Sequence, residues 1–336
     1  MNKTSRSLSA VAIALTAGLA LAACGSGSDD SKDGAKGADD GKTYKIGITK
    51  FVAHPSLDAV EEGFKAALEA KGVKVDVTPD DAQAEIANTT TIASKFAGSD
   101  LDLILAIATP SAQAMVNQIP DTPILFAAVT DPVGAGLVPS WEPSGTNVSG
   151  TSDLNPEGKP AHLVQEVLPD TKTIGFVYSL GEQNSVVQLK DLQAEAEELG
   201  MTVKEAGITN ASELGTAVQT LKGVDVIYVG TDNTVVDALV TVVDFAIANQ
   251  VPLFVADKAS AEKGGAVARG IDYYEMGLRT GEMAYQILVE GVDVGTLAPL
   301  QVVDTEIVIN PTSAEAQGLV IPPAIADAAT VVETKQ

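Results

Sequence analysis

The chain contains few cysteine, histidine and aromatic residues, and this composition excludes several classes of function. Its 336 residues include one cysteine, Cys24, and two histidines. A single cysteine excludes an intrachain disulfide and a cysteine-based zinc site. His54 and His162 are too few for a histidine-rich metal site. We therefore expect neither a bound metal nor a cofactor.

Basic charge is also scarce. The chain has 21 Lys and Arg against 45 Asp and Glu, which gives a net charge of −24. A strongly acidic surface repels phosphate backbones, so the sequence predicts no nucleic-acid partner.

Long hydrophobic runs are missing beyond the first residues. Residues 8–23 form an apolar run after Lys3 and Arg6, but a membrane-spanning helix needs roughly 20 strongly apolar residues. The run has the size of a signal-peptide core, so residues 1–23 are predicted to be a signal peptide; an uncleaved membrane anchor is the alternative. Removing its two positive charges from −24 leaves −26. Residues 24–42 are rich in Gly, Ser and Asp and predict a flexible tether.

From residue 43 onward, short apolar segments alternate with helical patterns. In residues 55–72, for example, Leu57, Val60, Phe64 and Leu68 share one helix face, and Gly72 stands where the helix should end. Ser56 is a candidate cap for its start. Such alternation predicts an α/β fold with parallel sheets. The predicted strands are residues 44–51, 73–78, 101–109, 122–130, 147–152, 173–179, 202–208, 224–231, 251–257 and 265–271; three further helices are predicted at 184–200, 234–250 and 273–291.

The same pattern occurs twice. "LDLILAIATPSAQAM" is echoed by "VDVIYVGTDNTVVDAL", and "TPILFAAVTDP" by "VPLFVADKASA". A third echo, between "YKIGITKFVAHPSLDAVEEGF" and "KTIGFVYSLGEQNSVVQLKDL", precedes them. Three echoes in the same order predict two similar Rossmann-like lobes, although any doubly wound protein shows some resemblance of this kind. Ligands of these sheets bind beyond the carboxyl ends of the strands. We therefore expect the loops at 51–56, 109–111, 130–132, 179–185, 231–233 and 257–260 to line one cleft.

These loops carry groups suited to an amino acid. Thr109 and Ser111 stand at a predicted helix start, where free N–H groups and hydroxyls suit a carboxylate, although Ser111 is equally suited to helix capping. Asp131, Asp232 and Asp257 stand at strand ends, where a partly buried acid suits an ammonium group. The alternative is that some of these three acids form turns or cap helices. The full set of predicted ligand-binding residues is Phe51, His54, Thr109, Ser111, Thr130, Asp131, Tyr178, Asn184, Ser185, Asp232, Asn233, Asp257 and Tyr273.

Enzyme motifs are weak or missing. The chain has no G-x-x-x-x-G-K-[ST] and no G-x-S-x-G. We therefore expect no enzyme. The alternative of a secreted α/β hydrolase requires His54 or His162 to reach a Ser or Asp in the cleft. A binding protein for a sugar or nucleoside is the third hypothesis, and the low aromatic content does not favour a stacked sugar.

Several segments together resemble a known family. "IGITKFVAHPSLDAVEEGF", "LILAIATPSAQA", "PILFAAVTDPVGAGLV", "NVSGTSD", "GEQNSVVQ" and "GIDYYEMG" resemble ABC-transporter substrate-binding proteins of the tryptophan/tyrosine-binding type. The resemblance implies a type I periplasmic-binding-protein fold with three crossovers. It places lobe 1 at 43–149 plus 272–297, and lobe 2 at 150–271 plus 298–336.

The resemblance also implies a place of action. "LAAC" at residues 21–24 is similar to a bacterial lipobox, which implies that Cys24 carries a diacylglycerol and a further acyl chain such as palmitate. The protein is then expected to be a monomer at the outer face of the cell membrane. It is expected to deliver an amino acid to an ABC permease, and the amino acids that the family transports include aromatic ones.

Overall fold

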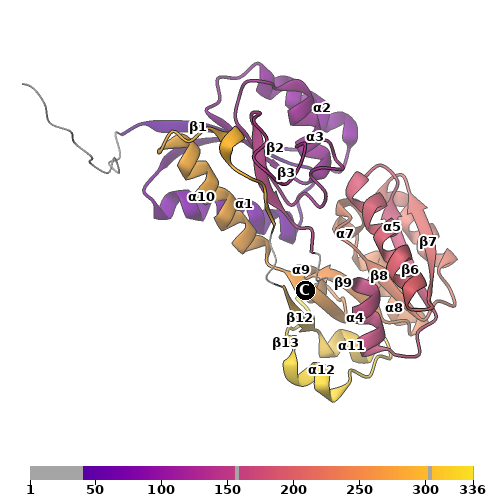
Figure 1. Cartoon of the computed structure of the whole chain (residues 1–336). Coiled ribbons are helices and arrows are strands. Elements are labelled where there is room, and N and C mark those ends of the chain that lie inside the picture. The colour runs from indigo at the N-terminus through magenta and orange to yellow at the C-terminus, as the bar shows by residue number, and fades with distance from the viewer. Residues whose placement is uncertain (1–40, 156–158, 302–304, 336) are drawn as a thin grey trace, which may run out of the picture. The chain divides into compact units, whose positions relative to one another are not determined.

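The computed structural model describes residues 41–155, 159–301 and 305–335. The predicted signal peptide, Cys24 and nearly all of the tether therefore lie outside the described residues. The described chain forms two mostly parallel β-sheets with helices packed on both (Figure 1). Each of the ten predicted strands is present, and the α/β prediction is confirmed.

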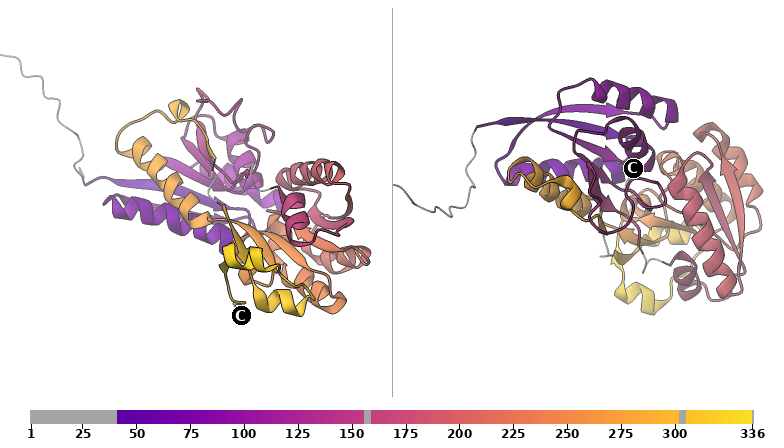
Figure 2. Two further views of the ribbon diagram at one scale, coloured as in Figure 1. Left: turned by 60° about the horizontal axis from the view of Figure 1, so that its bottom comes forward. Right: turned by 45° about the horizontal axis from the view of Figure 1, so that its top comes forward.

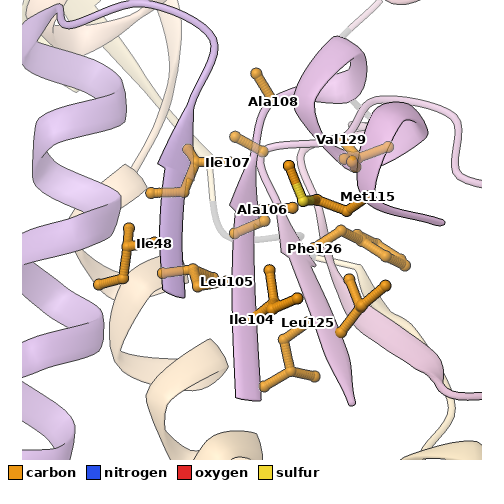
Figure 3. Close-up of a cluster of buried hydrophobic side chains, with 14 of the residues drawn as sticks. Ile48, Ile104, Leu105, Ala106, Ile107, Ala108, Met115, Leu125, Phe126 and Val129 are labelled. Atoms are coloured by element: carbon orange, nitrogen blue, oxygen red, sulfur yellow. The ribbon is translucent and has the colours of Figure 1, made fainter. Parts of the chain in front are cut away.

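The first sheet has six strands in the order β11-β5-β4-β3-β1-β2, all parallel. Their consecutive apolar residues are buried on both faces, as expected for parallel strands. Figure 3 shows part of this core, to which Ile104, Leu125, Phe126 and Met115 all belong. The strands are β1 (Thr43–Lys50), β2 (Lys74–Asp81), β3 (Leu103–Ile107), β4 (Ile124–Ala127), β5 (Val148–Ser152) and β11 (Leu300–Gln301).

The second sheet has seven strands in the order β13-β12-β10-β9-β8-β6-β7. Strand β12 is antiparallel to β10, which the sequence did not predict. The C-terminal segment, in yellow, lies beside the orange strands of this sheet (Figure 2). The strands are β6 (Thr173–Ser179), β7 (Thr202–Ile208), β8 (Val226–Val229), β9 (Leu253–Asp257), β10 (Val267–Ile271), β12 (Thr305–Ile309) and β13 (Thr330–Val331).

Helices cover both sheets. Those of the first sheet are α1 (Pro55–Ala70), α2 (Ile86–Ala97), α3 (Thr109–Gln118) and α10 (Tyr273–Leu288). Those of the second are α4 (Pro160–Val167), α5 (Gln183–Glu198), α6 (Leu214–Thr220), α7 (Asn233–Asp237), α8 (Val240–Asn249), α9 (Lys258–Glu262), α11 (Pro311–Ala316) and α12 (Pro323–Ala328). The helix predicted over 234–250 is thus interrupted between α7 and α8, where Leu239 and Thr241 donate to carbonyls three residues back.

Helix α10 packs against α1, although about 200 residues separate them (Figure 1). Glycines permit this close approach. A Cβ on Gly277 would lie 2.2 Å from the carbonyl oxygen of Val60, and one on Gly63 would lie 2.2 Å from that of Tyr274. The chain therefore returns to the first sheet after β10, at the second predicted crossover.

The strand pairing moves two of the expected lobe boundaries. A boundary at 149/150 would cut through β5, and one at 297/298 would assign β11 to the second lobe. Both strands belong to the first sheet, because Leu300 pairs with Thr151 and Gln301 with Ser152. We propose that the first lobe extends through residue 152 and includes β11. Strand β11 ends at Gln301 and β12, in the second sheet, begins at Thr305; the third predicted crossover is not tested, because the residues between these strands lie outside the described residues.

Candidate functional site

Loops at the carboxyl ends of strands from both sheets meet in one region, here called the loop cluster. It comprises the residues that follow β1, β3, β4, β6, β8 and β9. Two hydrogen bonds join its halves: Ser56 Oγ donates to Asp257 Oδ1 at 2.9 Å, and the hydroxyls of Thr130 and Thr231 are 3.2 Å apart. These bonds bring together the loops after β1, β4, β8 and β9, four of the six that the sequence predicts to meet.

Buried polar atoms without a protein partner are concentrated in and beside the loop cluster. They belong to residues that are no more than 5% exposed. Burying a polar group without a hydrogen bond costs about 1–3 kcal/mol, so a polar ligand that satisfied these atoms would be favoured. The atoms are both ring nitrogens of His54, Thr109 Oγ1, Ser111 Oγ, Asn184 Oδ1 and Asp153 Oδ1.

Helix α3 presents its N-terminus to this region through a strained turn. Ala108, the residue before the helix, has φ +77°, a conformation that is costly for a residue with a side chain. Ser111 lies in the first turn, and no side chain caps this helix. The capping alternative for Ser111 is therefore not realised, and its hydroxyl remains beside free backbone N–H groups that suit an anion.

The start of α7 is occupied by a buried glutamate that the sequence analysis did not select. Glu182 is 1% exposed and accepts hydrogen bonds from the backbone N–H and side chain of both Asn233 and Thr234, at 2.6–3.0 Å. Asn184 Nδ2 donates to the carbonyl of Thr231 at 3.0 Å. Asn184 and Asn233 are thereby fixed in orientation, and Asn184 does not cap its helix.

The three acids predicted at strand ends all accept hydrogen bonds from the protein. Asp131 accepts from Gly134 N and is half-buried. Asp232 caps α7 and also accepts from Ser185 Oγ at 2.6 Å. Asp257 caps α9 and accepts from Ser56 and Ser260. Their turn-forming and capping alternatives are therefore realised, and Ser56 donates to Asp257 rather than capping α1.

Asp232 lies close to a second buried carboxylate. Burial, and then the charge of Glu182, raise the pKa of Asp232 to about 8, although donors from Ser179, Ser185 and Val235 oppose the rise. The Asp232 carboxyl therefore retains its proton over much of the neutral range.

The predicted aromatic residues lie in the hydrophobic cores. Phe51 is 1% exposed within the core of the first sheet. Tyr178 packs beside Phe176 and donates its hydroxyl to Glu205 at 2.9 Å. Tyr273 begins α10 and donates its hydroxyl to Asp153 Oδ2 at 2.9 Å.

The histidines show no hydrolytic arrangement. His54 precedes α1 and is 5% exposed; burial lowers its pKa, while Asp257, Asn233 and Asp58 oppose the effect. Both of its nitrogens lack a hydrogen bond of normal geometry, and His162 Nδ1 is 3.9 Å from Glu195. Within the described residues, neither histidine makes the hydrogen bond to Ser or Asp that a hydrolase triad requires.

A cavity adjoins the loop cluster on the side of the second sheet. It lies between α4, α5 and the carboxyl ends of β8, β9 and β10, and we call it the Asp153 cavity. The sequence analysis missed most of its lining, although Asp153 stood in the motif "NVSGTSD" directly after a predicted strand. The lining includes Thr130, Asp153, Asp191, Glu195, Tyr228, Thr231 and Arg269.

The described residues hold no cluster of three or more His, Cys, Asp or Glu side chains suited to a metal ion. None of the helices in the described ranges is long and apolar enough to span a bilayer.

Two mostly parallel α/β halves with a cavity at the carboxyl ends of their strands form a type I periplasmic-binding-protein fold. A model of the family described as "ABC transporter substrate binding protein" matches residues 45–333. The chain belongs to this family. Members of the family act outside the cytoplasm as the solute-binding components of ABC transporters.

Relatives with known names or structures resemble most of the chain. A tyrosine-binding protein of Clostridioides difficile is 42% identical over 289 residues, which cover 84% of this chain and 83% of the relative. A Streptococcus pneumoniae domain solved with L-Trp is 32% identical, covers 87% of this chain and all of its own, and has a TM-score of 0.83. A ligand-free, open substrate-binding protein from Clostridium difficile covers the same shares at 42% identity, with a TM-score of 0.65.

Proposed function

We propose that this protein captures an amino acid with an aromatic side chain and delivers it to an ABC permease. One observation carries the proposal: buried polar atoms without a protein partner, contributed by segments next to both sheets, lie in and beside the loop cluster. Hydroxyls and amide oxygens held in this way suit a small zwitterion. The named tyrosine-binding relative and the relative solved with L-Trp support the ligand class.

In this proposal, the start of α3 receives the carboxylate of the ligand. Thr109 and Ser111 supply hydroxyls there, and the helix supplies free N–H groups and the positive end of its dipole. The other polar groups around the proposed ligand are those of Asn184, His54 and Thr130. The loops that carry these groups are held in place by the hydrogen bonds described above, which involve Ser185, Asn233, Asp232 and Asp257.

Isothermal titration of the purified protein with L-tyrosine, L-tryptophan, glucose and adenosine tests the proposal. We expect one amino acid to bind per protein, and neither glucose nor adenosine. Binding only to the sugar or nucleoside, or no binding at all by protein that unfolds cooperatively, would overturn it.

We further propose that the described arrangement is the closed form of a two-lobed clamp. The Ser56–Asp257 and Thr130–Thr231 contacts join the two halves. The TM-score is also lower against the open relative than against the relative solved with L-Trp, although the open relative is the more identical.

The anchoring of the protein is likewise a proposal. Residues 1–23 would direct export, Cys24 would carry the lipid, and residues 25–42 would link it to the folded part. Mass spectrometry of the membrane-fraction protein should show an N-terminal lipidated cysteine, and Cys24→Ser should release the protein from the membrane. A protein that stays membrane-bound after this substitution would contradict the role of Cys24.

A further inference from the structure

Asp153 has one carboxylate oxygen that the protein satisfies and one that it does not. The residue follows β5 directly and is 4% exposed. Its Oδ2 accepts the Tyr273 hydroxyl at 2.9 Å, whereas Oδ1 has no hydrogen-bond partner. Thr130 lies nearby, but its hydroxyl is 3.2 Å from that of Thr231, and no hydrogen bond of normal geometry reaches Oδ1. A buried carboxylate held in this way favours a cation beside its second oxygen.

The composition of the Asp153 cavity points to the same kind of ligand. Three acids border it, Asp153, Asp191 and Glu195, against the two bases Lys159 and Arg269. Arg269 faces Glu166 at 3.6 Å, so part of its charge is already offset. The cavity therefore favours a ligand that brings positive charge.

The other acids near the loop cluster are less suited to this role. Asp232 and Asp257 each accept three or more hydrogen bonds within the protein, from helix starts and serine hydroxyls. Glu182 accepts from Asn233 and Thr234 through both oxygens. Asp153 retains the open acceptor.

We propose that Asp153 binds the primary ammonium group of the ligand through Oδ1, and that Tyr273 is the positioning residue that holds the carboxylate. The inference rests on the proposed amino-acid function and assigns the group that recognises the amine. It also places recognition where the chain leaves the first sheet and where it returns to it, because Asp153 follows β5 and Tyr273 begins α10.

Titration with three probes tests this assignment. L-Tyrosine has both charged groups, 3-(4-hydroxyphenyl)propanoate lacks the ammonium and tyramine lacks the carboxylate. Losing a partner of a buried charge pair costs about 2–5 kcal/mol, so the propanoate should bind about 30-fold to several thousand-fold more weakly than L-tyrosine. Equal affinity for L-tyrosine and the propanoate would overturn the assignment.

Asp153→Asn provides the matched variant, because its amide oxygen can still accept the Tyr273 hydroxyl. We expect this variant to lose affinity for L-tyrosine and tyramine while its affinity for the propanoate stays within about threefold. Equal loss for all three probes would overturn the assignment. Asp170→Asn, in the exposed loop before β6, is the control and should match the unmodified protein.

Tyr273→Phe provides a second variant if Asp153→Asn fails to fold. Losing the hydrogen bond from the Tyr273 hydroxyl to Asp153 should weaken the binding of L-tyrosine more than that of the propanoate. Equal effects on the two ligands would indicate a structural role and overturn the assignment to Tyr273. Failure of the proposed function is distinguishable, because the unmodified protein would then bind neither L-tyrosine nor L-tryptophan.

Discussion

At the scale of single residues, the site is made of polar atoms that the fold buries without satisfying. Ser111 illustrates this: it is fully buried, lies in the first turn of α3, and its hydroxyl has no protein partner. Such a group lowers the stability of the ligand-free protein and becomes favourable when a ligand supplies the missing hydrogen bond. The same reasoning applies to Asn184 Oδ1 and Asp153 Oδ1.

Ser111→Ala should therefore separate binding from stability. We expect the affinity for L-tyrosine to fall about 5- to 30-fold, because one hydrogen bond to a charged ligand group is lost, at roughly 1–2 kcal/mol. The melting temperature without ligand should stay the same or rise. Titration and thermal melts measure the two effects, and a lower melting temperature with unchanged affinity would contradict this role of Ser111.

Asp153 also predicts how binding depends on pH. Burial raises the pKa of its carboxyl, opposed by the hydroxyls of Thr130 and Tyr273. An ammonium partner would lower that pKa in the complex. Affinity should therefore be full above the raised pKa of the free protein and fall as the pH drops through it. The other charged groups around this carboxylate are Lys159, Asp191, Glu195, Asp257 and Arg269.

The measurement is a titration with L-tyrosine from pH 4 to pH 8, for the unmodified protein and for Asp153→Asn. The variant should lose most of the pH dependence. Equal pH dependence in both proteins would show that another group controls binding.

At the scale of elements, α1 and α10 pack closely enough that glycine is required at their contact. Gly277→Ala places a Cβ 2.2 Å from the Val60 carbonyl oxygen and should destabilise the protein by about 1–3 kcal/mol or more. Gly215→Ala, in α6, is the matched control: its nearest neighbour is 3.9 Å away, and alanine is the better helix former. Urea unfolding measures both, and equal midpoints would contradict the packing argument.

The Asp232–Glu182 pair links the loop after β6 to the start of α7 and predicts a pH-dependent stability. The pKa of Asp232 in the folded protein, about 8, lies above its ordinary value of 3.8. Its contribution to stability is therefore fully present below the ordinary value and is lost as the pH rises towards 8, by at most about 1.4 kcal/mol per pH unit.

Asp232→Asn should flatten this part of the stability profile between pH 5 and pH 8. Urea unfolding at several pH values, for both proteins, measures the difference. Parallel profiles would contradict the raised pKa of Asp232.

Periodicity was sufficient to predict the strands, the main helices and the meeting of the loops, because these depend on local apolar patterns and on strand direction. It did not predict β12, which depends on pairing with β10, a partner about 40 residues away. Nor did it select Asp153, because the loop after the strand at 147–152 was not among those expected to line the cleft. For Asp232 and Asp257, local sequence allowed both capping and ligand binding, and only their hydrogen-bond partners distinguish the two.

At the scale of the whole molecule, the proposed binding mode requires contacts between the two halves. The Ser56–Asp257 hydrogen bond crosses between them and contributes about 1 kcal/mol to the proposed closed form. Ser56→Ala should therefore raise the dissociation rate of L-tyrosine about fivefold and change the association rate little. Stopped-flow fluorescence measures both rates, and an unchanged dissociation rate would argue against closure through this bond.

We propose that the protein recognises a free amino acid through both of its charged groups. Titration calorimetry of the unmodified protein with L-tyrosine, its propanoate analogue and tyramine tests this proposal. We expect one tight site for L-tyrosine and much weaker binding of both analogues. Equal affinity for all three, or no binding of L-tyrosine by folded protein, would contradict it.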